Sequence, residues 1–186
     1  TDVSIGAVAI PENTSTVDLI FGEAPLAQNT VTALLGGANA PNQVYIDLSS
    51  GMQTGILRTN WDLGFFAGDG FRVKLNASLG MAVKQINSTD LEEVLAIDST
   101  VAVGTQNGGV VENGDVSYVD NPDGTINGTI ISVAENEDDN KVYLVNLGFA
   151  LNPTTPSLGE ISPFGASRGF LKIRVLRDGD GYKLQY

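Results

Sequence analysis

The residue types that most often carry enzymatic chemistry are missing from this sequence. The chain of 186 residues contains no histidine and no cysteine. This composition removes Ser-His-Asp and Cys-His catalytic arrangements and histidine-based metal sites. It also argues against zinc, which proteins hold mainly through Cys and His. We find no recognisable catalytic centre and predict that the protein is not an enzyme.

Carboxylates remain as candidate chemical groups. Glycoside hydrolysis needs only two of them, and Asp62, beside Trp61, is the most suggestive acid. No second acid is marked as its partner, so we interpret Asp62 as a strand residue hydrogen-bonded at a sheet edge or turn. A carboxylate-based glycan hydrolase is the enzymatic alternative, ranked last.

Two acidic groups resemble calcium ligands in type but not in spacing. One comprises Asp120, Asp123 and Asn127, and the other lies within 135–139. Neither has the spacing of a dedicated calcium loop. We therefore interpret the first group as a turn and the second as a solvated loop, and we predict no metal site.

The overall charge limits the partners. The formal net charge is −12, and basic residues are absent from Thr1 to Leu57 and from Gln85 to Asn140. Binding to nucleic acid is disfavoured because phosphates require clustered Lys and Arg. No stretch of 18 apolar residues exists that could span a membrane. The start at Thr1 is typical of a processed, exported chain, to which an upstream lipid anchor could belong.

The elements that must position any site are predicted to be strands. Apolar residues alternate with polar ones, as in half-buried strands. The predicted strands are Val3–Ile10, Val17–Phe21, Val44–Leu48, Gly55–Phe66, Phe71–Leu75, Met81–Ile86, Lys141–Leu147, Phe170–Leu176 and Tyr182–Tyr186. A further hairpin, Asp115–Val119 with Thr125–Val133, is expected around the turn Asn121–Gly124.

These strands predict an all-β fold, an antiparallel sheet sandwich or partly closed sheet with at most one short helix. That helix is expected at Ser88–Glu93, capped by Ser88 or Thr89. We predict one domain over 1–186 that continues beyond the end of this chain. The predicted core contains Trp61, Phe65, Val73, Leu75, Val142, Leu144, Ile173 and Val175.

Several segments together resemble the HmuY-like family of Bacteroidetes, exported or surface-anchored β-proteins of which some bind haem. The resemblance covers about three quarters of the chain, from Val44 to the end. It is carried by VYIDLSSG at Val44–Gly51, WDLGF at Trp61–Phe65, FRVKLN at Phe71–Asn76, GMAV at Gly80–Val83, NPDG at Asn121–Gly124 and RVLRDGDGYKLQY at Arg174–Tyr186.

The resemblance implies a ligand cleft and a role in haem capture beside a TonB-dependent outer-membrane receptor. It also implies two axial haem ligands, which are His or Met in relatives. Laid over this chain, those positions hold Thr125 and Leu147, and neither side chain ligates iron. Haem is therefore a candidate ligand whose expected axial ligands are missing.

The remaining candidate ligand-binding residues are two methionines and two tyrosines. Met81 is the better methionine because Gly80 beside it allows a flat ring to approach, whereas Met52 follows a turn and is expected to be exposed. Tyr118 and Tyr143 could supply a phenolate ligand. Packing is the alternative role for both methionines.

Two non-enzymatic functions remain open from the sequence. The first is a surface ligand-binding protein, for haem or another small ligand, located at the outer membrane or outside the cell. The second is a surface adhesin or structural β module, which the acidic composition and the missing axial ligands favour.

Overall fold

The computed structural model describes residues 30–37, 39–66, 68, 70–103, 105–107, 110–112, 116–121, 123–154 and 164–186. Residues 33–186 form one compact unit. The predicted strands Val3–Ile10 and Val17–Phe21 lie outside the described residues. The single domain over 1–186 therefore stays a prediction.

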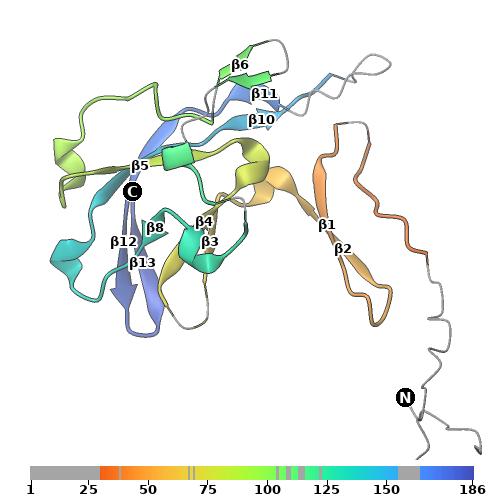
Figure 1. Cartoon of the computed structure of the whole chain (residues 1–186), viewed down its shortest axis with the longest axis horizontal. Coiled ribbons are helices and arrows are strands. Elements are labelled where there is room, and N and C mark those ends of the chain that lie inside the picture. Colours follow the sequence, from red (N-terminus) through yellow and green to blue (C-terminus); the bar gives the residue numbers. More distant parts are fainter. Residues whose placement is uncertain are drawn as a thin grey trace, which may run out of the picture. The chain divides into compact units, whose positions relative to one another are not determined.

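The described residues form antiparallel sheets, which confirms the all-β prediction (Figure 1). The largest sheet has the order β13-β12-β9-β5, and a three-stranded sheet has the order β3-β4-β8. These strands are β3 Leu63–Phe65, β4 Arg72–Leu75, β5 Ala82–Ile86, β8 Ile131–Ser132, β9 Val142–Asn146, β12 Phe170–Asp178 and β13 Gly181–Gln185.

Three hairpins complete the strand inventory of the described residues. They are β1 Asn42–Ile46 with β2 Gln53–Leu57, β6 Thr105–Asn107 with β7 Val110–Glu112, and β10 Phe149–Leu151 with β11 Phe164–Ser167. Side chains of the β6–β7 hairpin lie outside the described part of the structure.

The two larger sheets pack face to face around the main core. Alternate residues of β4, β5, β9 and β12 point into it, as their period-two pattern predicts. The buried cluster contains Val73, Leu75, Leu79, Met81, Val83, Ile131, Val133, Tyr143, Val145, Ile173 and Val175. On the opposite face of the four-stranded sheet, Ala82, Leu144 and Val101 form a smaller cluster.

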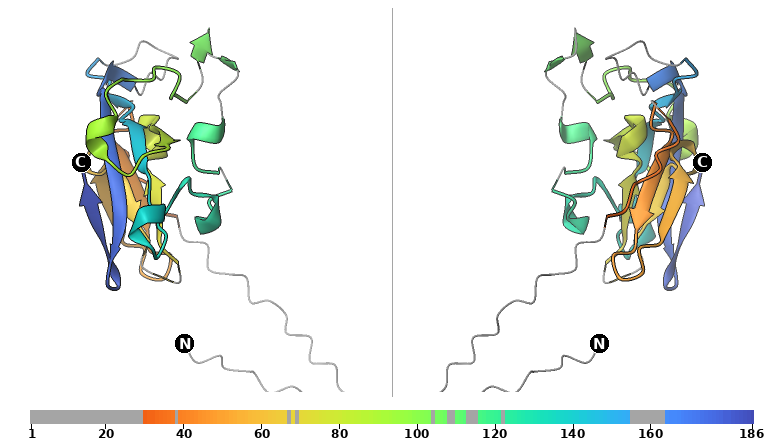
Figure 2. Two further views of the ribbon diagram at one scale, coloured as in Figure 1. Left: turned by 90° about the vertical axis from the view of Figure 1, so that its left-hand side faces the viewer. Right: turned by 90° about the vertical axis from the view of Figure 1, so that its right-hand side faces the viewer.

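The sheets can be followed edge-on in Figure 2, where the long β12–β13 hairpin is blue. Its register pairs Val175 with Leu184, and on the other side β12 pairs Ile173 with Tyr143 of β9. The predicted hairpin at the end of the chain and the buried strand at 142–146 are therefore confirmed.

Two strand predictions were wrong. The segment Gly55–Phe66 is not one strand, because a 3-10 turn at Arg58–Asn60 separates β2 from β3. The predicted hairpin around Asn121–Gly124 is replaced by 3-10 turns at Val116–Tyr118 and Ile126–Gly128, and among the described residues of this segment only Ile131–Ser132 is strand.

The helix prediction reduces to a short turn. Leu91–Glu93 forms a 3-10 turn, and Asp90, not Ser88 or Thr89, caps it by accepting a hydrogen bond from the Glu92 N–H. The remaining described helical segments are also 3-10 turns, Ala77–Leu79 and Glu137–Asp139. None of them could span a membrane.

Most of the predicted core is buried, with two differences. Val73, Leu75, Val142, Leu144, Ile173 and Val175 are buried. Trp61 is only half-buried. Phe65 is 40% exposed, because β3 is an edge strand and the Phe65 ring contacts mainly the Tyr182 ring, at 5.0 Å between centroids.

Candidate functional site

Met81 lies between two cavities. It precedes β5 and follows Gly80, whose φ of 68° is favourable for glycine. The Met81 side chain is 1% exposed and packs in the main core, yet it lines a cavity on each of two sides. It is the soft side chain common to both cavities.

The first cavity, which we call the Gly124 cavity, has a volume of about 280 Å³. Its described apolar lining comprises Leu75, Ala77, Met81, Val103 and Val119. Lys74, Asp120 and Asn121 supply its polar groups, and Gly124 adds backbone. Such an apolar lining with few polar groups is typical of small-molecule sites, and the volume lies just below their usual range of roughly 300–1,000 Å³.

Asn76 organises one side of this cavity. Its side-chain Nδ2 donates to the carbonyls of Arg58 and Trp61, both at 2.7 Å, and its Oδ1 accepts from the N–H and the hydroxyl of Ser78. Asn76 is fully buried, although simple alternation along β4 predicts an outward-facing residue. These bonds fix the turn Ala77–Leu79 that leads to Met81.

Asp120 fixes the other side. Its carboxylate accepts the backbone N–H of Leu75 at 2.8 Å and that of Ile130 at 3.0 Å. The loop that carries Val119 and Asn121 is therefore attached to the end of β4. Asp120 therefore has a structural role, and no cluster of three His, Cys, Asp or Glu residues that could hold a metal occurs among the described residues.

The second cavity, which we call the Tyr186 groove, has a volume of about 320 Å³. It lies between β3 and β13, the edge strands of the two larger sheets. Its lining is almost entirely apolar and comprises Leu63, Phe65, Met81, Val145, Leu147, Leu171, Ile173, Leu184 and Tyr186, with Asp62 as its one acidic group.

Asp62 is engaged in an ion pair. Its two carboxylate oxygens accept hydrogen bonds from the Arg168 guanidinium at 2.7 and 3.2 Å. Arg168 also donates to the carbonyl of Leu147. The interpretation of Asp62 as a hydrogen-bonded structural residue therefore agrees with its geometry.

The structure does not bring the four candidate ligand residues together. Tyr143 is buried in the main core with Met81, and burial raises the pKa of its phenol. Tyr118 packs against the opposite face of the four-stranded sheet, with the Lys84 ammonium 6.0 Å from its ring centre. Met52 lies directly before β2 and is 70% exposed.

The structure does not place the two positions implied for axial ligands at one cavity. Thr125 is exposed next to Gly124, and its N–H and hydroxyl both donate to Asp123. Leu147 lines the Tyr186 groove as part of its apolar lining.

Sequence reasoning missed the Tyr186 groove and the presence of Lys74 at the Gly124 cavity. A signal for the groove was present, because Tyr182, Leu184 and Tyr186 alternate along the last strand. This alternation predicts that the three side chains lie on one face of the strand. It does not predict that β3 leaves this face uncovered. Lys74 carried no signal beyond its outward position.

Comparison with known proteins gives one match. The family model described as HmuY protein matches residues 39–160. No curated protein matches the chain, and no solved structure does. The matched range includes β1 to β10, both sides of the Gly124 cavity and Met81. The chain belongs to the HmuY family.

Proposed function

We propose that this chain is an exported, non-enzymatic ligand-binding protein and that the Gly124 cavity is its ligand site. HmuY proteins are binding proteins associated with haem, and the family match covers the cavity. The observation that carries the proposal is the position of Met81, a buried soft side chain at the boundary of an apolar cavity.

We infer that a haem iron held by two side chains does not fit these residues. The positions implied for axial ligands hold a hydroxyl and an aliphatic side chain. Tyr143 is buried in the core, and Tyr118 packs on the far face of the sheet. Met81 supplies the only sulfur at the cavity among the described residues. Haem is therefore a weaker ligand here than in relatives with two axial side chains.

A haem titration followed through the Soret band tests this proposal. Met81→Leu removes the sulfur while nearly conserving side-chain volume, a change that typically costs less than about 1.5 kcal/mol of stability. We expect any Soret shift to disappear in Met81→Leu and to persist in the control Met52→Leu. Tight binding that survives Met81→Leu would show that the site lies elsewhere.

The surroundings of the protein follow from the same proposal. A family role in haem capture places the chain at the outer membrane or outside the cell, beside a TonB-dependent receptor. Fractionation of cells that express the natural gene tests the location, and recovery only in the cytoplasm would contradict it. Chemical cross-linking in those cells tests the receptor.

A surface adhesin or structural β module is the second candidate function. The β1–β2 hairpin favours it, because Tyr45 in β1 and Leu48 and Met52 in the connecting turn are exposed. Exposed apolar side chains grouped in this way often mark interaction surfaces. A double variant, Leu48→Ser with Met52→Ser, should reduce cell adhesion in this case and leave ligand binding unchanged.

A further inference from the structure

We propose that the ligand of the Gly124 cavity carries an anionic group and that Lys74 is the counter-ion for that group. This inference rests on the proposed function and adds a ligand class to it. The ligand is an apolar molecule bearing a carboxylate or a similar acid. Lys74 is then the residue that distinguishes this ligand from a neutral one.

Lys74 is unusual among the basic residues of the chain. Within the described residues, the basic side chains other than Lys74 and Lys183 have protein partners. Arg72 donates to Thr129, Lys84 pairs with Asp98, Arg168 pairs with Asp62, and Arg174 pairs with Glu137. Arg58, Lys141, Lys172 and Arg177 donate to backbone carbonyls. The Lys74 ammonium has no such partner among these residues, and Lys74, an exposed residue, is part of the cavity lining.

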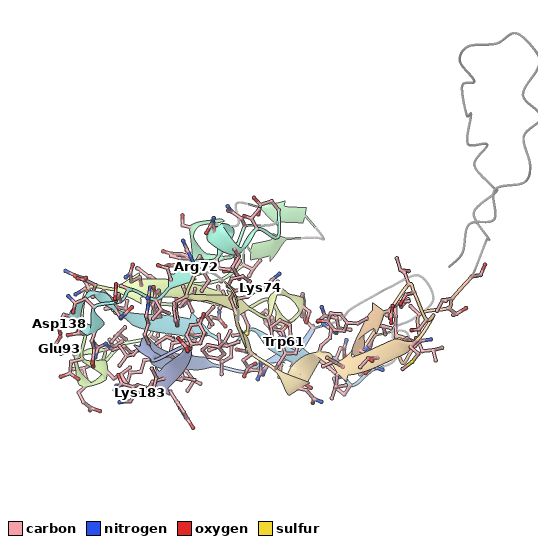
Figure 3. All side chains as sticks on the ribbon, turned by 90° about the horizontal axis from the view of Figure 1, so that it is seen from below. Trp61, Arg72, Lys74, Glu93, Asp138 and Lys183 are labelled. Carbon is pink, nitrogen blue, oxygen red and sulfur yellow. The ribbon has the colours of Figure 1, made fainter. Side chains whose placement is uncertain are left out.

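Among the residues that the structure describes, no acidic side chain forms an ion pair with Lys74. In the strand register Lys74 lies opposite Gly64, so β3 presents no side chain at that position. Asp120 lines the same cavity and keeps its negative charge, but its carboxylate oxygens are directed to the backbone N–H groups of Leu75 and Ile130 and form no ion pair with Lys74. Figure 3 shows Glu93 and Asp138 at the far end of the unit from Lys74.

An unpaired cation beside an apolar cavity selects a particular chemistry. The net charge of −12 makes most of this chain unattractive to anions. At the Gly124 cavity, by contrast, an acid group can reach the Lys74 ammonium while the rest of the ligand contacts Leu75, Met81 and Val119. A cationic ligand would be repelled by Lys74, and a neutral ligand would lose the charge-assisted contact.

Two fluorescent probes with the same ring system separate the apolar and the ionic contributions. These probes are 1-anilinonaphthalene-8-sulfonate, which is anionic, and N-phenyl-1-naphthylamine, which is neutral. Lys74→Met keeps an aliphatic side chain and removes the charge. Lys183→Met is the matched control, because Lys183 is also unpaired and Figure 3 shows it well away from Lys74.

We expect Lys74→Met to weaken binding of the anionic probe by about fivefold, the effect of a partly exposed ion pair. The affinity of the neutral probe should not change, and Lys183→Met should affect neither probe. Added salt should weaken the anionic probe in the wild type more than in Lys74→Met. Equal losses in both lysine variants would overturn the proposal, because they would reflect net charge alone.

A cavity-filling variant distinguishes a failure of the Lys74 proposal from a failure of the proposed ligand site. Val103→Trp places a large ring at the cavity and should reduce binding of both probes. If both probes bind the wild type and Val103→Trp blocks them, but Lys74→Met has no effect, Lys74 is not the counter-ion and the cavity remains the site. If Val103→Trp changes neither probe, the proposed site itself is wrong.

Discussion

Asp62 and Arg168 are separated by 106 positions in the sequence and form a two-pronged ion pair, with N–O distances of 2.7 and 3.2 Å. The pair links the start of β3 to the turn between β11 and β12. Through its third bond, to the Leu147 carbonyl, Arg168 also joins the end of β9 to this contact. The acid that most resembles a catalytic residue in the sequence therefore connects three parts of the sandwich.

Asp62→Asn should lower the free energy of unfolding, and it should not abolish any enzymatic activity. The Asp62 and Arg168 side chains are 38% and 22% exposed, so we expect a loss of about 1 kcal/mol in the free energy of unfolding. Urea unfolding followed by the fluorescence of Trp61 measures this loss. Asp180→Asn, at an exposed turn, serves as the control. A polysaccharide hydrolysis activity lost in Asp62→Asn would instead revive the hydrolase function.

Asn76→Ala should be more damaging than its polar character suggests. The substitution leaves the buried carbonyls of Arg58 and Trp61 without their donor and frees Ser78. Unsatisfied buried groups cost about 1–3 kcal/mol each, so we expect a loss of roughly 2–4 kcal/mol. Thermal unfolding measures the change, with the exposed Asn127→Ala as control. Equal effects of the two variants would contradict the role given to Asn76.

The ion pair between Asp98 and Lys84 should make stability depend on acid pH. The hydrogen bond from Lys84, at 2.7 Å, and those from Thr100 lower the pKa of Asp98 from 3.8 to about 2. A carboxyl whose pKa is depressed in the folded state stabilises that state above its unfolded pKa and loses this effect as pH falls. The stability advantage of the wild type over Asp98→Asn should therefore shrink between about pH 4 and pH 2.

Thermal melts of the wild type and Asp98→Asn across this range provide the measurement. Asp47, whose pKa is also lowered to about 2 by hydrogen bonds from Ser49, remains in both proteins. Its contribution therefore cancels in the comparison. A difference in melting temperature that stays constant down to pH 2 would show that Asp98 is not stabilised as its geometry indicates.

Gly148→Ala should strongly destabilise the sandwich. Gly148 has a φ of 69°, and an added Cβ would lie only 2.8 Å from the carbonyl carbon of Leu79. Gly169 has a φ of 85° but open space around its Cβ position, so Gly169→Ala carries only the backbone strain, about 1–2 kcal/mol. Chemical denaturation should show a clearly larger loss for Gly148→Ala, and similar losses would refute the steric argument.

The parts of the fold that the sequence predicts are those with local alternation. Val73 and Leu75 in β4, and Tyr143 and Val145 in β9, face the main core, whereas Leu144 packs on the opposite face of the sheet. The ends of strands were predicted less well where hydrogen bonds to residues distant in the sequence determine them. The β2 strand stops at Arg58 because the guanidinium donates to the carbonyls of Asn39, Ala40 and Ser78.

The missing hairpin around Asn121–Gly124 has a similar cause. Asp120 takes the backbone N–H groups of Leu75 and Ile130 through its side chain. These bonds replace part of the strand ladder that the turn sequence suggests. No local pattern reveals that a carboxylate serves two backbone groups 45 and 10 positions away. The two cavities could not be predicted for the same reason, since they depend on which strands lie next to each other in the fold.

The shared position of Met81 has a thermodynamic consequence. A single flexible side chain borders both the Gly124 cavity and the Tyr186 groove, so a guest that shifts its rotamer in one also reshapes the other. Any such effect is reciprocal: the factor by which one guest changes the affinity of the second equals the factor in the reverse direction. Met81 would thus make the two compartments into one linked system.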